Sequence, residues 1–426
     1  MHPNVMLIEF SIKNFGPFKE KAVLSMEPTN LDGNEGNLID CAPIGDKLLG
    51  SAVIFGANAS GKSYVLKAME VLQLMVRAPM APNLMYPWYQ PFRASRRTLS
   101  APTELSITYV ADGVKYNYSL SFDKNHVVSE SLYYYPRRRM ALVFSRNGNH
   151  FEFGRTAMKG LKASSLMTSP SSAFLPIAAQ YNNEVCLAAH KGIVNDIVII
   201  GGNPSNLLNK VIEHINNNPE SKRHMMKAMR IADMGICSIT GHIKTRKAAE
   251  LINQIPQQVI GLMMATGNTE ISETSLFLEH DFKDSDVDKD VLRFPFEIES
   301  NGTMQLFCLM GPIIDALEKG FTVMVDEYGT FLHSEIAKWL IRQFRGAANP
   351  NKAQLIVNTQ DQSLLSLELL RRDQVWFTQK DMDSGASELY SLSDFNGVRA
   401  DIDLQKSYSV DKFGARPFIP DEDVMI

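Results

Sequence analysis

One segment of the sequence carries residues suited to holding a phosphate group. Gly56-Ala57-Asn58-Ala59-Ser60-Gly61-Lys62-Ser63 matches G-x-x-x-x-G-K-[ST] at every fixed position. An apolar run from Ala52 to Phe55 precedes it, and apolar residues at helical spacing follow to about Arg77. In such a loop, glycines let backbone N–H groups wrap a phosphate, and the helix N-terminus adds a favourable dipole. The pattern therefore predicts that Lys62 reaches the β- and γ-phosphates of a nucleotide and that Ser63 ligates Mg²⁺.

A second segment could supply the acidic half of the same site. The apolar run Phe321 to Val325 ends in Asp326-Glu327. We expect Asp326 to hold Mg²⁺, directly or through water, and Glu327 to polarise the attacking water as a general base. An acidic pair after a strand could also simply begin a turn, so the prediction depends on its pairing with the phosphate-binding loop.

The spacing of these two segments predicts the domain organisation. Asp326 follows Lys62 by 264 residues, which requires a large insertion in a compact nucleotide-binding domain. Residues 1–160 are rich in alternating runs, with a strong hairpin signal at Asp112-Gly113. We predict an α/β fold in which residues 1–160 form the N-terminal half of an ATPase head, 161–290 an inserted, mainly helical lobe, and 291–426 the C-terminal half. Further elements expected are a strand at 8–12, helices near 205–217 and 220–233, a helix at 334–344 and a strand at 354–357.

The composition excludes several classes of protein. The chain has 426 residues, 45% of them apolar, and 43 basic against 47 acidic side chains give a net charge of −4. No overall positive field would therefore draw it onto nucleic acid or anionic lipid. The four cysteines form no C-x-x-C pair, which fits a reducing cytoplasm. No run reaches the about 18 to 20 apolar residues of a membrane span, since Leu306 to Leu317 is interrupted by Gly311, Pro312 and Asp315. We expect a soluble cytoplasmic protein without a membrane partner.

Several further segments together resemble a known group of ATPases. Glu299-Ser300-Asn301-Gly302-Thr303 resembles the ABC-type signature as it occurs in RecF/SMC-like ATPases. Nearly the whole chain resembles the bacterial RloA/AbiL-type ATPases, which are related to the ATPase subunits of Septu, PARIS and OLD-type anti-phage systems. The other segments that carry this resemblance are Met6 to Phe10 with Lys13-Asn14-Phe15, Ala232 to Ile236, Leu332-His333, Leu369 to Gln374, and Phe413 to Ile419.

The resemblance implies an ABC-type head that dimerises around ATP. Ser300, Asn301, Gly302 and Thr303 would act in trans, with Ser300 and the Gly302 backbone touching the γ-phosphate on the partner's phosphate-binding loop. Leu332 and His333 would lie near the D-loop at the dimer seam. Gln90, before Pro91-Phe92, is a weak candidate for the Q-loop glutamine, and an ordinary loop residue is about as good an interpretation.

One position departs from the pattern of these families. After the strand at 354–357 they usually place a switch histidine, whereas this chain has Asn358-Thr359-Gln360-Asp361. Gln360 can hydrogen-bond a γ-phosphate or water, but it cannot take up a proton near neutral pH. We expect slow ATP hydrolysis, unless Glu327 carries the base role well enough for Gln360 to substitute.

Two functions remain in competition on the sequence alone. The favoured hypothesis is an ATP- and Mg²⁺-dependent ATPase subunit of an anti-phage defence system. It would assemble as a homo-oligomer and control a separate effector, a nuclease or toxin encoded nearby, in response to nucleic acid or a phage protein. The alternative is a DNA-repair or DNA-maintenance ATPase that binds DNA directly, for which the basic, aromatic run Tyr133 to Arg139 is a candidate surface. That run, like Arg371-Arg372 at an expected helix end, could equally be an exposed charged face.

Overall fold

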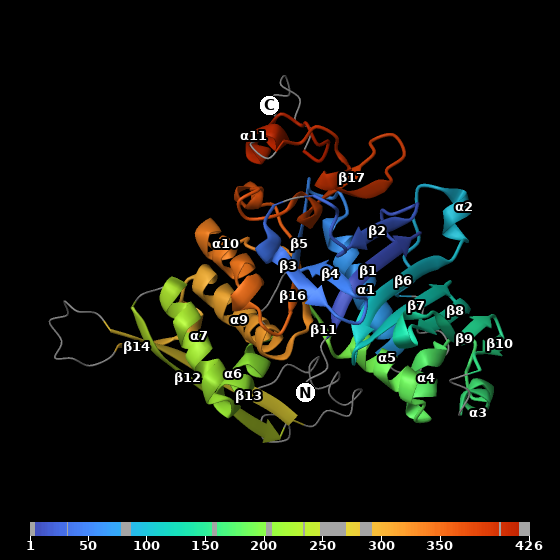
Figure 1. Ribbon diagram of the computed structural model, residues 1–426. Helices are drawn as coiled ribbons and strands as arrows, with labels where there is room; N and C mark the ends of the chain where they lie inside the picture. Colours follow the sequence, from blue (N-terminus) through green and yellow to red (C-terminus); the bar gives the residue numbers. More distant parts are fainter. Residues whose placement is uncertain are drawn as a thin grey trace. The chain divides into compact units, whose positions relative to one another are not determined.

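The computed structural model describes residues 5–31, 33–77, 87–155, 160–201, 207–232, 235–247, 270–281, 292–399 and 402–416. The chain divides into two compact units (Figure 1). The first, here called the head, comprises Met1–Gly202, Ala316–Thr330 and Ala337–Ile426. The second, here called the insert, comprises Asn203–Asp315 and Phe331–Ile336. Of the segments that carry the family resemblance, residues 233–234 and 417–419 lie outside the described residues.

A six-stranded sheet forms the centre of the head. Its order is β11-β15-β16-β5-β17-β18, and all neighbours are parallel except the antiparallel pair β17 and β18. The strands are β5 (Ser51–Gly56), β11 (Ile197–Ile200), β15 (Thr322–Val325), β16 (Gln354–Asn358), β17 (Val375–Lys380) and β18 (Ser387–Ser391). Because β16 lies between β5 and β15, its last residues emerge between the two segments predicted to bind the nucleotide.

A seven-stranded antiparallel sheet forms the β-rich part of the head, in the order β10-β9-β8-β7-β6-β1-β2. The strands are β1 (Met6–Lys13), β2 (Ala22–Ser25), β6 (Thr103–Ala111), β7 (Val114–Phe122), β8 (Val127–Tyr134), β9 (Ala141–Asn147) and β10 (His150–Phe153). The hairpin predicted at Asp112-Gly113 is confirmed, because both residues have positive φ, +49° and +74°, between β6 and β7. The predicted α/β fold with a β-rich N-terminal lobe is likewise confirmed.

Helix α1 (Lys62–Arg77) belongs to a core formed with both sheets. The apolar residues that the sequence placed on one face of this helix are all buried: Val65, Leu66, Met69, Leu72 and Met75. They share one hydrophobic cluster with Phe10 and Ile12 of β1 and with Ile54 of β5. Gln73 is also buried, and its amide nitrogen donates to the carbonyl oxygens of Ile193 and Ile197, at 2.7 and 2.6 Å. Those two bonds satisfy a polar group that would otherwise be costly to bury.

A single buried glutamine connects the two sheets of the head. The Gln354 side chain in β16 accepts from the backbone N–H of Leu7 at 2.6 Å and donates to the carbonyl oxygen of Leu7 at 3.1 Å. It also donates to the carbonyl oxygen of Leu49 and accepts from the Thr322 hydroxyl. The N-terminal strand is thereby fixed against the nucleotide-binding sheet.

Residues 161–202, which the sequence analysis assigned to the inserted lobe, belong to the head. They form α3 (Leu161–Leu166), α4 (Phe174–Gln180), α5 (Glu184–Val194) and β11. The buried carboxylate of Glu130 in β8 accepts the backbone N–H groups of Phe174 and Leu175, at 2.6 and 2.9 Å. A carboxylate at a helix N-terminus is stabilised by the helix dipole, and this contact attaches α4 to the antiparallel sheet. The predicted boundary at 160/161 therefore does not coincide with the edge of the compact unit.

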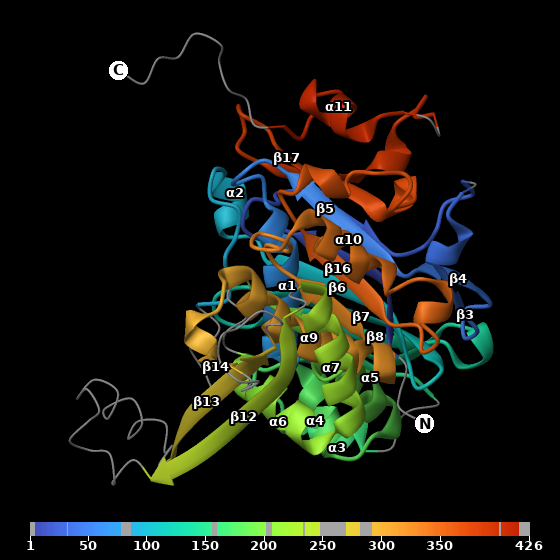
Figure 2. The same ribbon diagram turned by 90° about the vertical axis from the view of Figure 1, so that its left-hand side faces the viewer.

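The insert contains a sheet as well as helices. Helices α6 (Leu208–Asn217) and α7 (Pro219–Ala232) lie near the predicted helical segments. The sequence did not predict the antiparallel sheet of β12 (Ile236–Lys247), β13 (Glu270–His280) and β14 (Leu292–Pro295), whose first two strands form the long ribbon in Figure 2. In β13 alternate residues Leu276, Leu278 and His280 are buried, which is the period of a half-buried strand.

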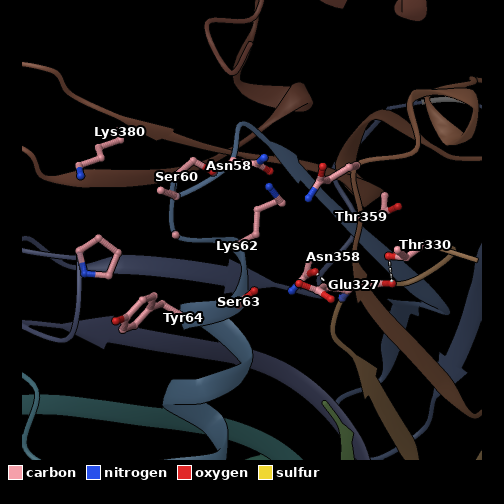
Figure 3. A pocket seen from close by; sticks show the side chains of 14 residues that line it. Asn58, Ser60, Lys62, Ser63, Tyr64, Glu327, Thr330, Asn358, Thr359 and Lys380 are labelled. Atoms are coloured by element: carbon pink, nitrogen blue, oxygen red, sulfur yellow. Dashed lines mark hydrogen bonds between the residues drawn. The ribbon is translucent and has the colours of Figure 1, made fainter. Parts of the chain in front are cut away.

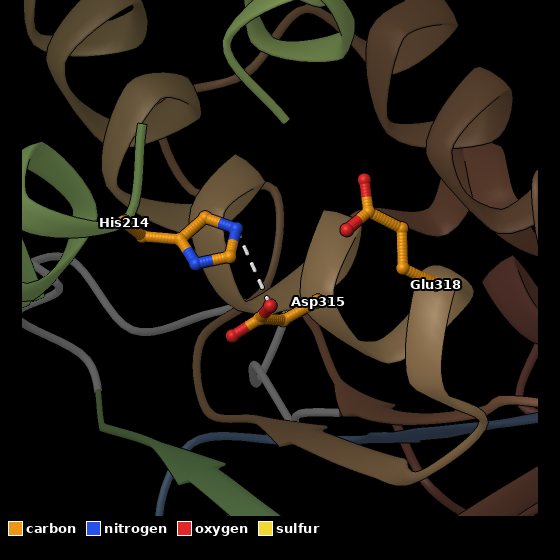
Figure 4. A group of neighbouring side chains, drawn as sticks. All are labelled: His214, Asp315 and Glu318. Atoms are coloured by element: carbon orange, nitrogen blue, oxygen red, sulfur yellow. Dashed lines mark ion pairs between the residues drawn. The ribbon is translucent and has the colours of Figure 1, made fainter. Parts of the chain in front are cut away.

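Helices α6 and α9 (Asn301–Lys319) pack closely within the insert. A Cβ at Gly311 would lie 2.5 Å from the Val211 side chain, so only glycine permits this approach. The Nε2 atom of His214 lies 3.3 Å from Oδ1 of Asp315 (Figure 4). The glycine that interrupts the apolar run of α9 thus has a packing role.

Arg371 is not at an exposed helix end, so that prediction is wrong. Its side chain is buried, pairs with Asp373 at 3.0 Å, and donates to the carbonyl oxygens of Gly33 and Leu31 at 2.6 and 2.8 Å. A guanidinium can be buried when each of its donors finds an acceptor. Arg371 therefore holds Thr29, Leu31 and Gly33 against the start of β17.

Two further strands and three further α-helices are described. They are β3 (Leu38–Cys41), β4 (Asp46–Leu49), α2 (Arg96–Leu99), α10 (Ser334–Arg342) and α11 (Leu404–Ser409). Among the helices in the described ranges, none combines the length and apolarity needed to cross a membrane.

Candidate nucleotide-binding site

The head contains a cavity of about 610 Å³ at the end of β5 (Figure 3). Residues from five parts of the chain line it: the turn before β2, the phosphate-binding loop, and the ends of β15, β16 and β17. The lining residues are Pro17, Asn58, Ala59, Ser60, Gly61, Lys62, Ser63, Tyr64, Glu327, Thr330, Asn358, Thr359, Gln360 and Lys380.

The phosphate-binding loop runs from β5 to α1 in a conformation that requires glycine. Gly61 has a φ of +109°, and a Cβ at Gly56 would lie 2.5 Å from the Thr378 carbonyl oxygen of β17. The hydroxyls of Ser60 and Thr378 are 2.6 Å apart, which fixes the loop to the same strand. The loop is therefore held by β17 as well as by its own strand and helix.

Lys62 is folded back onto its own loop. Its Nζ donates to the carbonyl oxygens of Gly56 and Ala57, at 2.7 and 2.8 Å. Burial lowers the pKa of Lys62, while the nearby carboxylates of Asp326 and Glu327 oppose that effect. A buried ammonium whose hydrogen bonds go to neutral carbonyls is stabilised further when it contacts a phosphate.

The two predicted Mg²⁺ ligands meet in the structure. The Ser63 hydroxyl donates to Oδ1 of Asp326 at 2.8 Å, although the two residues are 263 positions apart. A hydroxyl and a carboxylate are the hard oxygen ligands that Mg²⁺ takes in proteins. This donor set fits a magnesium ion that also binds the phosphates of a nucleotide.

The predicted base and switch residues both line the cavity. Glu327 follows β15 with a left-handed backbone, φ +53°, and its carbonyl oxygen accepts from the Thr330 hydroxyl at 2.7 Å. Gln360 follows β16 and is exposed. The structure thus brings Lys62, Ser63, Asp326, Glu327 and Gln360 to one edge of the sheet, where ligands bind in open α/β folds.

Asn358 is a site residue that the sequence analysis missed. Its amide nitrogen donates to Oδ1 of Asp326 at 2.5 Å, and its side-chain oxygen accepts from the backbone N–H of Glu327 at 2.9 Å. An asparagine at the end of a strand is common, so only its position between β5 and β15 could have indicated this role. Pro17, Tyr64, Thr330 and Lys380 were missed for the same reason, since their place in the fold brings them to the cavity.

The signature segment lies in the insert, at the start of α9. The hydroxyl of Ser300 accepts the backbone N–H of Thr303 at 3.1 Å and lies 2.8 Å from the Thr303 hydroxyl, so Ser300 caps the helix. A Cβ at Gly302 would lie 2.7 Å from the Phe331 carbonyl oxygen, which brings the segment of Leu332 and His333 next to the signature. Ser300 and Asn301 are exposed.

The rim of this segment is apolar. Ile298 is 64% exposed and Phe331 is 55% exposed, although both are large apolar residues. Leu332 is buried, whereas His333 is exposed. Two large apolar side chains are thus exposed beside the polar signature.

Gln90 is not brought to the cavity. Its side-chain amide donates to the Pro87 carbonyl oxygen at 3.2 Å, and its own carbonyl oxygen accepts from the N–H of Gly16 at 2.6 Å. These contacts fit the ordinary loop residue that was the alternative interpretation.

Comparison with known proteins gives one family match. Residues 51–366 match the family described as "AAA domain, putative AbiEii toxin, Type IV TA system". No curated protein sequence matches the chain.

Three solved structures are similar to the chain at low identity. An Smc head bound to the C-winged helix domain of ScpA has 13% identity and a TM-score of 0.43, covering 90% of this chain and 97% of that chain. The SMC head domain from Thermotoga maritima has 11% identity and a TM-score of 0.40, with 90% and 98% covered. An Smc head with an extended coiled coil, bound to the C-terminal domain of ScpA derived from Pyrococcus furiosus, has 13% identity and a TM-score of 0.38, with 96% and 99% covered. Because these TM-scores are low, the fold assignment depends on the strand order and loop geometry described above.

Proposed function

The chain belongs to the family described as AAA domain, putative AbiEii toxin, type IV toxin–antitoxin system, and from this premise we propose that its head binds ATP with Mg²⁺ and hydrolyses it to ADP and phosphate. The observation that carries the proposal is the 2.8 Å contact of Ser63 with Asp326 in a cavity that Lys62 and Glu327 also line. Two chain segments that are distant in sequence supply complementary halves of one site.

In the proposed reaction, water attacks the γ-phosphorus and the bond to the β–γ bridging oxygen breaks. Lys62 leaves the loop carbonyls and binds the β- and γ-phosphates, while Glu327 takes the proton of the attacking water. Ser63 and Asp326 would hold the Mg²⁺, which would supply positive charge beside the phosphates. Gln360 orients the water or the γ-phosphate but cannot take up a proton, so turnover is slow.

Removal of the metal tests this arrangement. We expect chelation of Mg²⁺ with EDTA to reduce phosphate release from ATP by about 10²-fold or more, because the metal contributes several kcal/mol of charge stabilisation. Phosphate release by the purified chain is measured with and without added Mg²⁺, and an excess of Mg²⁺ over chelator is the control. Hydrolysis that is indifferent to the chelator contradicts the assignment of Ser63 and Asp326.

We further propose that two copies close over two nucleotides, with Ser300 and the Gly302 backbone contacting the γ-phosphate bound by the partner. The exposed signature and its apolar neighbours Ile298 and Phe331 support this. The ATP-bound form would be the dimer or a higher oligomer, because each complete site needs residues from two copies.

A charge at Ser300 should block that assembly. We expect Ser300→Arg to reduce ATP-dependent dimer formation at least about tenfold, because a long cation replaces an exposed hydroxyl at the seam, while ATP still binds to the monomer. Light scattering after gel filtration measures the mass with and without a non-hydrolysable ATP analogue. Asn217→Arg, at an exposed position of the same unit, is the matched control. An ATP-dependent dimer of unchanged strength in Ser300→Arg would contradict the trans role.

For the biological role, we propose the ATPase subunit of a cytoplasmic anti-phage defence system of the RloA/AbiL kind. The family description, which names a toxin of a toxin–antitoxin system, and the resemblance of the motifs support this role. ATP-dependent assembly would control a separate nuclease or toxin encoded nearby, and nucleic acid or a phage protein would be the trigger. Co-expression with the neighbouring gene tests it: toxicity or phage protection must depend on Lys62.

A DNA-maintenance ATPase is the second candidate, and one surface favours it. Arg137 and Arg139 are exposed at the turn between β8 and β9, and Arg138 donates to the Ala42 carbonyl oxygen at 3.1 Å. Duplex binding that weakens steeply with salt and is lost when Arg137 and Arg139 are both replaced by Ala would favour this candidate over the defence role.

A further inference from the structure

Asn358 occupies the one strand end that lies between both halves of the candidate site. It is the last residue of β16, it is 1% exposed, and it lines the cavity beside Glu327 (Figure 3). A fully buried amide needs partners for its donor and its acceptor. The identity of those partners indicates what the residue does.

The donor end of the amide is directed to the candidate metal ligand. Nδ2 of Asn358 lies 2.5 Å from Oδ1 of Asp326, the same oxygen that accepts from the Ser63 hydroxyl at 2.8 Å. Two donors to one carboxylate oxygen restrict its orientation. Asp326 is thus held toward Ser63 before any metal is bound.

The acceptor end of the amide holds the backbone of the candidate base. Oδ1 of Asn358 accepts the N–H of Glu327 at 2.9 Å, and the Asn358 carbonyl oxygen accepts the N–H of Tyr328 at 2.9 Å. Glu327 has a left-handed backbone, which is unfavourable for a residue with a side chain unless its surroundings impose it. Asn358 binds the amide on each side of the Glu327 Cα, so it imposes this conformation.

We propose that Asn358 is a positioning residue. Its one side chain orients both the carboxylate of the metal ligand Asp326 and the backbone of the general base Glu327. This inference rests on the proposed ATPase function, because it assigns Asn358 to that reaction. In this role Asn358 acts through Asp326 and Glu327. Its side chain links the Asp326 carboxylate to the Glu327 backbone, so that loss of its amide disturbs metal use and catalysis together.

The test replaces the amide by a side chain of similar size. Asn358→Leu should lower kcat for ATP about 10- to 100-fold and raise the Mg²⁺ concentration for half-maximal activity several-fold. Its affinity for ATP measured without Mg²⁺ should stay within about twofold of wild type, because Lys62 and the loop are unchanged. A purely structural role would not raise the Mg²⁺ requirement while leaving metal-free binding intact.

Asn349 provides a matched control in the same unit. It is 3% exposed, and its side chain likewise uses both ends, donating to the Ala353 carbonyl oxygen and accepting the Ala353 N–H, each at 2.8 Å. It does not line the cavity. Asn349→Leu should therefore lower the melting temperature without changing the Mg²⁺ requirement or kcat of the folded fraction.

The outcomes of this experiment distinguish failure of the positioning role from failure of the proposed ATPase function. If Asn358→Leu does not fold, Asn358→Ser removes the same two hydrogen bonds with a small polar side chain and is expected to give the same shift in Mg²⁺ requirement. If the folded variants match wild type in kcat and Mg²⁺ requirement, the positioning role of Asn358 is wrong, whereas the proposed ATPase function is not contradicted. If wild type neither binds nor hydrolyses ATP, the proposed function fails and the role of Asn358 fails with it.

Discussion

Replacing Lys62 by Ala should abolish nucleotide binding in the head. Lys62 is 8% exposed, and its ammonium donates to the carbonyl oxygens of Gly56 and Ala57 in its own loop. Each charge-assisted hydrogen bond to a phosphate contributes about 1.5 to 3 kcal/mol. Two such bonds give about 3 to 6 kcal/mol, so the Kd for ATP should rise by about 10²- to 10⁴-fold.

Isothermal titration calorimetry, with ATP added to the protein in the presence of Mg²⁺, measures this change in Kd. Lys191→Ala is the control, because Lys191 belongs to α5 of the same unit but lies outside the cavity. The melting temperature of Lys62→Ala without nucleotide should stay close to that of wild type. ATP binding at wild-type affinity in this variant would remove the phosphate-binding role of the loop, and the proposed function with it.

Glu327→Gln should stop hydrolysis while ATP binding persists. Glutamine has nearly the same shape as glutamate but cannot accept the proton of the attacking water. General-base catalysis typically contributes about 10²- to 10⁴-fold, so kcat should fall by that factor. Because ATP would then remain bound between two copies, the variant should accumulate as an ATP-bound dimer.

Two measurements check this expectation. Single-turnover phosphate release gives the rate, and light scattering with ATP and Mg²⁺ gives the mass of the trapped species. Glu388→Gln makes the same chemical change on β18, in the same unit but away from the cavity, and should behave as wild type. A wild-type rate in Glu327→Gln would mean that another group accepts the proton.

The sequence predicted well the features that short segments specify. The loop from Gly56 to Ser63 with its flanking strand and helix, the hairpin at Asp112-Gly113 and the buried face of α1 all appear where the local pattern placed them. Each depends on residues within a few positions of one another, such as the positive φ of a two-residue turn or the spacing of apolar residues on one helix face. The turn, the loop and the buried helix face can therefore be predicted from residues that are close together in the sequence.

Other predictions failed because partners far along the chain decide them. Arg371 looked like an exposed charge, but the carbonyls of residues 29–33, over three hundred positions away, allow its burial. Residues 161–202 looked like part of an insertion, but Glu130 in β8 attaches α4 to the head. Burial of a charged group is favourable only when such a partner is present, and a local pattern does not contain the partner.

The sequence by itself determined that this chain carries a phosphate-binding loop and an acidic strand end suited to Mg²⁺ and ATP. Only the tertiary structure decided that β16 lies between those two segments and presents the Asn358 side chain to the carboxylate of Asp326 and to the backbone N–H of Glu327. The physical reason is that strand order in a sheet is set by backbone hydrogen bonds and core packing between distant segments, which leave no mark on the spacing of neighbouring residues.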